Sequence, residues 1–352
     1  MDFIVNLLGP KPMSPYETGE YVHSVSKNVR VNWDGIRFVA NELYSTLSAN
    51  QYDLSAWRKH PLHPKTLCDT TINWIFLVDS LNFSFWANKG EEFAVTWRGV
   101  EYIGYWALCA AINRALDQGI PMVDPAYYGN LTLYQVKRIL KAHRPGKPNE
   151  LIDFPLMEER HRIMRKHGKV LMNLGNNFAA LIVKSKSSAM ILLKKILDRF
   201  PSFRDVAEYN GKKVSFHKRA QILIADIYAC YENQGIGHFH DIEELTAFAD
   251  YRVPQILYYY NALTYKNELI ARLKFGELMR HGDPDETEIR AGTIYAVEKI
   301  KHQVRRLARR NQNHSLIINS IIVDFWLWDT RRSNAEAIDF KLPHHKVRSI
   351  YY

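Results

Sequence analysis

The sequence predicts a mainly α-helical protein with one small β element in its N-terminal third. Apolar residues recur every three or four positions along most of the chain after residue 104, which is the spacing of helices with one buried face. Short breaks that contain glycine or proline separate these stretches. The segments 93–97 and 100–103, joined by Arg98 and Gly99, are typical of a β-hairpin.

The expected elements begin with an irregular N-terminal segment. Several prolines and a glycine predict loop structure for residues 1–30. Residues 73–86 are apolar and fit either a helix or a strand. Helices are expected at residues 34–47, 106–116, 132–142, 158–171, 188–200, 218–231, 241–248, 254–263, 266–279 and 286–310.

The breaks between these elements are short, so we expect residues 31–352 to form one compact domain. The segment 142–153 is the exception. It contains Pro145, Gly146 and Pro148 and is predicted to be a surface linker.

Composition narrows the class of protein. The 352 residues are 47% hydrophobic and 24% charged, which is typical of a globular protein. The net charge of +10 favours polyanions or phosphate-bearing small molecules as partners. We expect no membrane span or signal peptide, and hence a cytoplasmic or nuclear protein. Three scattered cysteines fit neither a disulfide framework nor a zinc site.

Motifs of several enzyme classes are missing from the sequence. There is no phosphate-binding Gly-x-x-x-x-Gly-Lys loop, no Gly-x-Gly-x-x-Gly turn and no Gly-x-Ser-x-Gly elbow. No His-x-Glu, Cys-x-x-Cys or His-Glu-x-x-His pattern occurs either. We therefore expect no metal and no cofactor.

The first candidate site is the segment FADYRVPQ (248–255). Asp241 and Glu244 have the spacing of a capping box and predict a helix that must end before Pro254, which suits the start of the next helix. Asp250 and Arg252 would then lie in a tight joint between two helices. Either this carboxylate is functional, or it pairs with Arg252.

The second candidate site is an apolar run that contains Asp324 and Asp329. A buried carboxylate must be paired or hydrogen-bonded, or it takes up a proton. Five residues apart, the two acids need not share a helix face. Salt bridges to Arg331 and Arg332 are the alternative explanation.

Two basic segments could bind phosphate groups. Lys218 and Arg219 fall at the predicted start of a helix, where backbone N–H groups favour anions. Residues 301–310 carry four arginines at helical spacing. Both segments are also compatible with an ordinary solvated surface.

Eight segments match one known family: NWIF (73–76), LNFSFW (81–86), GYWALCAAINRALD (104–117), EERHR (158–162), FPSFRD (200–205), KRAQIL (218–223), FADYRVPQ (248–255) and VRSIYY (347–352). Through them the chain resembles the queuosine salvage protein family, the queuosine 5′-phosphate N-glycosylases (hydrolases) that free the base queuine. The resemblance covers nearly the whole chain from about Val31.

The resemblance implies a fold similar to that of helix–hairpin–helix DNA glycosylases. It also implies an enzyme that cleaves the N-glycosidic bond of queuosine 5′-monophosphate with water. The catalytic acid of the family falls on Asp250. Its queuine-contacting positions fall on His60, Phe248, Ser320, Asp324 and Asp329.

These residue types suit the reaction. Breaking the C1′–N bond builds positive charge on the sugar, which an ionised carboxylate stabilises. A second carboxylate can accept the two N–H donors of a guanine-like edge. His60 can donate a proton near neutral pH. Lys218 and Arg252 are candidates for binding the 5′-phosphate.

The expected partner is this small-molecule substrate, with no stable nucleic-acid partner and no membrane. Two other functions stay open: a base-excision glycosylase acting on polymeric nucleic acid, and a non-catalytic RNA-binding protein that uses residues 301–310. The sequence leaves open whether a covalent intermediate forms and which acid contacts which part of the base.

Overall fold

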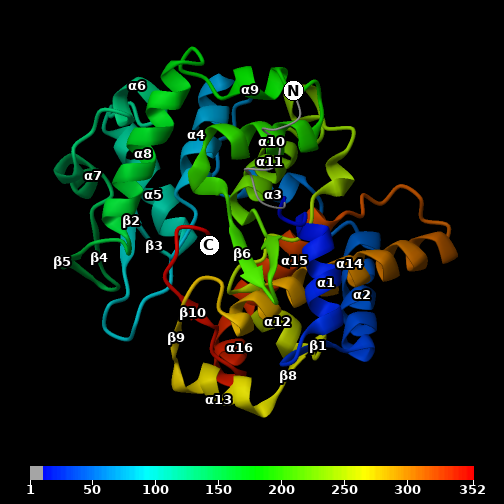
Figure 1. Cartoon of the computed structure of the whole chain (residues 1–352). Helices are drawn as coiled ribbons and strands as arrows, with labels where there is room; N and C mark the ends of the chain where they lie inside the picture. The colour runs from blue at the N-terminus through cyan, green and yellow to red at the C-terminus, as the bar shows by residue number, and fades with distance from the viewer. Residues whose placement is uncertain (1–10) are drawn as a thin grey trace, which may run out of the picture. The chain divides into compact units, whose positions relative to one another are not determined.

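Helices dominate the computed structural model, which describes residues 11–352 (Figure 1). The chain divides into two compact units. Unit 1 comprises the described residues up to Asp53 together with 204–218 and 245–348, and unit 2 comprises 54–203, 219–244 and 349–352. The single domain expected over residues 31–352 stays a prediction.

Unit 1 is built around one long helix, α14 (Pro284–Arg310). The helices α1 (Pro15–Val25) and α2 (Trp33–Ser48) pack along it, and both lie beside it in Figure 1. A Cβ atom at Gly19 of α1 would lie 3.0 Å from a side-chain carbon of Ile294, so a small residue suits this close crossing. The other helices of unit 1 are α12 (Val253–Tyr259), α13 (Asn267–Phe275), α15 (Ser320–Ser333) and α16 (Ala335–Lys341).

Three pairs of short strands complete unit 1. The strands β1 (Val29–Val31) and β8 (Leu263–Tyr265) pair antiparallel. The same is true of β6 (Val206–Tyr209) and β7 (Lys212–Ser215), whereas β9 (Leu278–Met279) and β10 (Lys346–Val347) pair parallel. Strands of two to four residues offer few alternating positions, and these pairs were not predicted, although Asn210 and Gly211 between β6 and β7 are a typical hairpin turn with φ of 49° and 73°.

Unit 2 contains most of the remaining helices. Ten of the twelve residues of α4 (Asp69–Ser80) are buried, which explains why its sequence shows no amphipathic period. The others are α3 (Ser55–Lys59), α5 (Tyr105–Asp117), α6 (Pro125–Tyr128), α7 (Leu133–Ile139), α8 (Met157–Met172), α9 (Ala179–Val183) and α10 (Ala189–Arg199). The helix α11 (Lys218–Cys230) starts at the last residue of a unit 1 segment and otherwise belongs to unit 2.

The predicted hairpin is confirmed as β2 (Ala94–Trp97) and β3 (Val100–Ile103). Arg98 and Gly99 both have positive φ, 48° and 77°, as the two-residue turn of a twisted hairpin requires. A second hairpin, β4 (Ala142–Arg144) and β5 (Lys147–Ile152), extends it to a four-stranded sheet. The segment 142–153, predicted as a surface linker, forms this hairpin, with Pro145 and Gly146 in its turn and residues 145–151 exposed.

The prediction of irregular structure for the N-terminal segment is wrong for residues 15–25, which form α1. Ser14 and Glu17 form a capping box and Pro15 occupies the first turn, so α1 begins there. Residues 1–10 of that prediction lie outside the described residues. Nine of the predicted helices correspond to observed ones, namely α2, α5, α7, α8, α10, α11, α12, α13 and α14.

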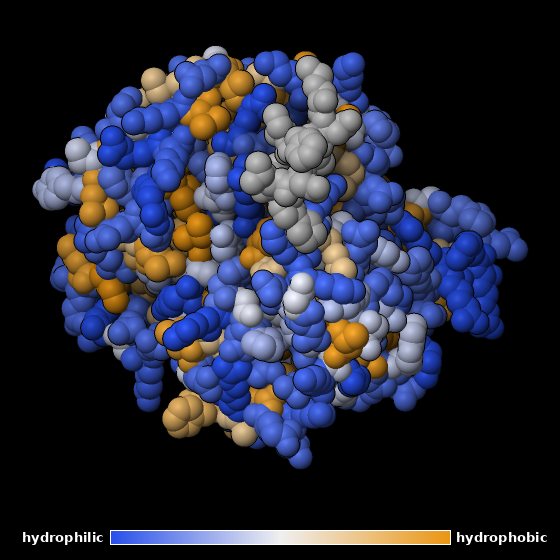
Figure 2. All heavy atoms as spheres, viewed as in Figure 1, coloured by the Kyte–Doolittle hydropathy of each residue, from blue (hydrophilic) through white to orange (hydrophobic). Residues whose placement is uncertain are grey.

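Hydrophilic residues predominate on the face drawn in Figure 2, where apolar residues form small, separate groups. Among residues 11–352, none of the helices combines the length and apolar character that crossing a membrane requires.

Candidate active site

Asp250 ends a buried segment of unit 1, residues 245–250, that has no regular secondary structure. Its carboxylate Oδ1 accepts hydrogen bonds from the backbone N–H groups of Arg252, at 2.7 Å, and Val253, at 2.9 Å. These two groups lie at the start of α12. The backbone thus holds this carboxylate in one orientation, with 9% of the residue exposed.

The helix predicted over 241–248 is wrong. Only one 3₁₀ turn, Ile242–Glu244, forms there. The side chain of Asp241 does not cap a helix of its own but accepts hydrogen bonds from the N–H of Ala189, at 2.5 Å, and from the hydroxyl of Ser188, at 2.6 Å, at the start of α10. The joint that carries Asp250 is therefore an extended segment followed by a helix.

Asp324 of α15 lies next to this segment and is only 4% exposed. Its Oδ2 accepts a hydrogen bond from the backbone N–H of Phe248 at 2.9 Å. Burial and the nearby charge of Asp250 raise the pKa of Asp324 well above its ordinary value, although the Phe248 N–H and the charge of Lys218 oppose this shift. The structure thus brings together two carboxyl groups, of which Asp324 holds a proton more readily than an ordinary aspartate.

Lys218 belongs to the same cluster. It is buried at the start of α11, where its backbone N–H lies 3.3 Å from Oδ2 of Asp205, and its charge acts on Asp324. Arg252 is oriented differently. Its guanidinium contacts the side chains of Gln255, at 3.1 Å, and Asp339, at 3.4 Å, so Arg252 reaches Asp250 through its backbone.

Ser320 lies one helical turn before Asp324, on the same face of α15. Its hydroxyl donates to Oε1 of Glu298 at 2.5 Å and accepts from Nζ of Lys301 at 3.1 Å. Lys301 and Glu298 form an ion pair of 2.6 Å. Buried charges thus fix the orientation of this hydroxyl.

Asp329 differs from Asp324 in its exposure to solvent and in the face of α15 on which it lies. It is exposed, and its Oδ2 accepts a hydrogen bond from the hydroxyl of Tyr52 at 2.6 Å. The two acids lie on different faces of α15, as a separation of five residues implies. Arg331, named above as an alternative partner for these acids, binds Asp339 at 2.5 Å.

His60 belongs to unit 2, where it follows α3. Its ring stacks on that of Trp106, with centroids 3.5 Å apart and planes inclined by 8°. Its Nδ1 accepts a hydrogen bond from the N–H of Leu62 at 3.3 Å, so the neutral ring carries its proton on Nε2. Nearby, burial lowers the pKa of His63 to about 3.

The side chain of Arg219 makes contacts inside unit 2. It is buried in unit 2, where its guanidinium donates to the backbone carbonyls of Ser80, at 2.5 Å, and Ser202. It also lies over the ring of Phe203, 4.7 Å from its centroid. These contacts use the charge of Arg219 within the protein.

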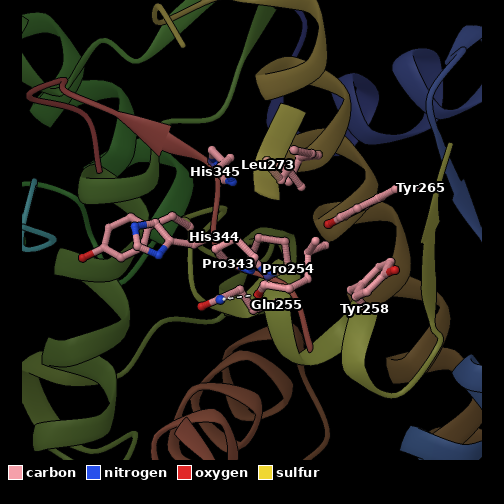
Figure 3. A pocket seen from close by; sticks show the side chains of 11 residues that line it. Pro254, Gln255, Tyr258, Tyr265, Leu273, Pro343, His344 and His345 are labelled. Carbon is pink, nitrogen blue, oxygen red and sulfur yellow. Dashed lines mark hydrogen bonds between the residues drawn. The ribbon is translucent and has the colours of Figure 1, made fainter. Parts of the chain in front are cut away.

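A small hollow beside the start of α12 is lined by residues of unit 1 (Figure 3). Tyr251, Pro254 and Gln255 form part of its wall, and Figure 3 shows Tyr258 and Tyr265 close together on one side. Neither Asp250 nor Asp324 lines this hollow, so it is separate from the two carboxyl groups.

A metal ion in a protein is usually held by several converging side chains. Within residues 11–352, no three His, Cys, Asp or Glu side chains converge so that they could hold a metal ion. The three cysteines are free thiols.

Two residues behind the site were not predicted from the sequence. Arg290 is fully buried and its Nε donates to the carbonyl of Ala249 at 2.9 Å. Asp205 forms a buried ion pair with it. The sequence did contain a signal that Arg290 is unusual. It lies one residue after buried Ile289 on the core-facing side of a predicted helix, where an arginine is rarely found.

Comparison with known proteins identifies the class to which this mainly helical chain, with its two neighbouring aspartates, belongs. The model of the queuosine salvage protein family matches residues 62–352, and the chain belongs to this family. Similar proteins named queuosine 5′-phosphate N-glycosylase/hydrolase include one from Mus musculus, 43% identical over 98% of this chain and 100% of the relative. Another, from Nematostella vectensis, is 41% identical over 97% and 99%. A bacterial relative from Sphaerobacter thermophilus is 37% identical over 88% and 90%.

Proposed function

We propose that this protein hydrolyses the N-glycosidic bond of queuosine 5′-monophosphate and releases queuine for salvage into tRNA modification. Membership of the family over residues 62–352 and the names of the relatives support this activity. The structural observation that carries it is the proximity of Asp250 to Asp324, whose Oδ2 binds the N–H of Phe248 two residues before Asp250.

Asp250 is the catalytic acid of this proposal. As the C1′–N bond breaks, its electrons move to the base and positive charge develops on the ribose. The Asp250 carboxylate, oriented by the N–H groups of Arg252 and Val253, stabilises that charge. Water then supplies its hydroxyl to C1′ and a proton to the base, which gives ribose 5-phosphate and queuine.

Asp324 recognises the base. A guanine-like edge presents two N–H donors in one plane, which a carboxylate accepts together. In the protein without substrate, burial favours the protonated form of Asp324. When the base binds, Asp324 releases that proton and accepts hydrogen bonds from the two N–H groups of the base. These hydrogen bonds offset the cost of a buried negative charge. Phe248 stacks on the base, Ser320 lies one turn away on the same helix face, and exposed Asp329 suits the cationic amine of queuine.

Lys218 and Arg252 bind the 5′-phosphate in this proposal. Lys218 already lies within the electrostatic range of Asp324, and the guanidinium of Arg252 is partly exposed beside the segment that carries Asp250. In this proposal His60, as the imidazolium ion, gives a proton to the departing base, and the attacking water restores that proton. The same proposal includes a fold similar to that of helix–hairpin–helix DNA glycosylases.

A substrate panel tests this function. Purified protein is incubated with queuosine, queuosine 5′-monophosphate and queuosine-containing tRNA, and free queuine is measured by mass spectrometry. We expect release from the monophosphate and little from the other two. Release from intact tRNA would instead favour the polymer glycosylase. Release from none of them, together with RNA binding that weakens steeply with salt, would favour the RNA-binding protein.

A further inference from the structure

Arg290 forms a buried connection behind the candidate active site. The residue is 0% exposed, and its guanidinium lies over the ring of Phe216, 4.0 Å from the centroid. Its Nε–H donates to the carbonyl oxygen of Ala249 at 2.9 Å. Ala249 directly precedes Asp250, so this hydrogen bond fixes the backbone from which the catalytic carboxylate projects.

Asp205 continues this connection to the start of α11. Its two carboxylate oxygens accept hydrogen bonds from Arg290 at 3.0 and 2.5 Å. The same side chain lies 3.3 Å from the N–H of Lys218, and the Asp205 carbonyl accepts from the N–H of Phe216 at 3.0 Å. One arginine–aspartate pair thus connects the backbone beside Asp250 with the backbone of Lys218.

We propose that Arg290 and Asp205 form a positioning clamp, which holds the catalytic carboxylate of Asp250 and the backbone at Lys218 in register for the same substrate. This inference rests on the proposed function. Neither member of the clamp needs to touch the substrate. Misplacing a reacting group by about 1 Å can cost about 100-fold in rate, so such a pair acts on turnover rather than on binding.

The chemistry of the pair favours positioning over simple stabilisation. Two buried charges are costly to desolvate, and well-packed apolar residues of similar size often stabilise a protein as much or more. The guanidinium, however, offers planar donors in fixed directions. Arg290 uses them to bind one carbonyl and two carboxylates, because Glu286 also lies 3.3 Å from it. An apolar pair could not orient the Ala249 carbonyl.

The test compares two buried arginine-to-lysine substitutions. Arg290→Lys keeps the positive charge but cannot donate to Ala249 and to both Asp205 oxygens at once. Arg160→Lys is the matched control, because Arg160 is also 0% exposed and donates to the carbonyls of Leu81 and Phe83, both at 2.6 Å. Both variants should lose similar thermal stability. Only Arg290→Lys should lose turnover, with kcat about 10- to 100-fold lower and KM within about threefold.

Hydrogen exchange gives a readout that does not depend on activity. In Arg290→Lys, amides in peptides covering 216–219 and 248–255 should exchange about tenfold faster or more, whereas in Arg160→Lys they should not. Asp205→Asn, the second and milder variant, should show the same pattern. Combining Asp205→Asn with Arg290→Lys should cost less than the sum of the two, because the residues act as one unit.

Two results would overturn the clamp. One is unchanged exchange in those peptides with unchanged kcat in folded Arg290→Lys and Asp205→Asn proteins. The other is an equal loss of kcat in Arg160→Lys. If the wild-type protein released no queuine from the monophosphate, the proposed function would fail, whereas the exchange rates would still decide whether Arg290 orders both segments.

Discussion

The Oδ2 atom of Asp324 lies 2.9 Å from the backbone nitrogen of Phe248 and accepts its hydrogen bond. Five residues further along the chain, the N–H of Val253 donates to Asp250. The two acids therefore bind the backbone at both ends of the segment 248–253. Each carboxyl group is oriented by backbone N–H groups rather than by a flexible side chain. This arrangement places a proton-holding acid beside a backbone-bound carboxylate.

Replacing Asp324 by Asn should make the protein more stable at neutral pH. The raised pKa means that the folded protein binds a proton which the unfolded chain releases, so stability falls as pH rises above the ordinary carboxyl value of 3.8. Asn keeps an oxygen for the Phe248 N–H without a charge. We expect melting to occur roughly 2–4 °C higher at pH 7, with the difference shrinking as pH falls toward 4.

Thermal unfolding between pH 4 and 8 measures this effect. Asp198→Asn is the control, because Asp198 is an exposed acid of α10 paired with Lys194 at 3.1 Å. It should change melting little at any pH. A stability difference for Asp324→Asn that does not vary with pH would contradict the assignment of a buried, proton-holding acid.

Lys218→Met and Arg252→Met should reduce the preference for the phosphorylated substrate. A lost hydrogen bond to a charged group costs about 1.5–3 kcal/mol, or roughly 10- to 150-fold in kcat/KM. The measurement is kcat/KM for queuosine 5′-monophosphate divided by kcat/KM for queuosine. Lys194→Met, at an exposed position of α10, should leave this ratio unchanged. An unchanged ratio in either of the first two variants would remove that residue from the phosphate site.

His60→Phe separates ring stacking from proton donation. Phenylalanine can still stack on Trp106, 3.5 Å away, but it has no Nε2–H. General acid catalysis contributes about 10²- to 10⁴-fold, so kcat should fall within that range and the alkaline limb of the pH–rate profile should flatten. A kcat within about twofold of wild type would show that His60 only stacks.

The sequence was sufficient for features that depend on local signals. The helices α2 and α14 follow from apolar spacing, and the β2–β3 hairpin follows from Arg98 and Gly99, which take the left-handed geometry of a tight turn. The match to the family also indicated Asp250 and Asp324. Their proximity agrees with that indication, and their roles stay proposals.

Features that depend on distant partners were not predictable. The capping box at Asp241 is a valid local signal, yet its carboxylate binds the start of α10 instead, about fifty residues earlier in the chain. Similarly, burial of Arg290 depends on Asp205 and on the Ala249 carbonyl, neither of which is near it in sequence. Tertiary contacts overrode the local pattern in both cases.

The most direct test of the account is single-turnover release of queuine from queuosine 5′-monophosphate by wild-type protein and by Asp250→Asn. Asparagine keeps an oxygen for the N–H groups of Arg252 and Val253 but has no charge, so the variant should fold. We predict that the wild type releases stoichiometric queuine and that Asp250→Asn does so at least about 1,000-fold more slowly with unchanged melting. Release by the variant at a rate near that of the wild type would contradict the account.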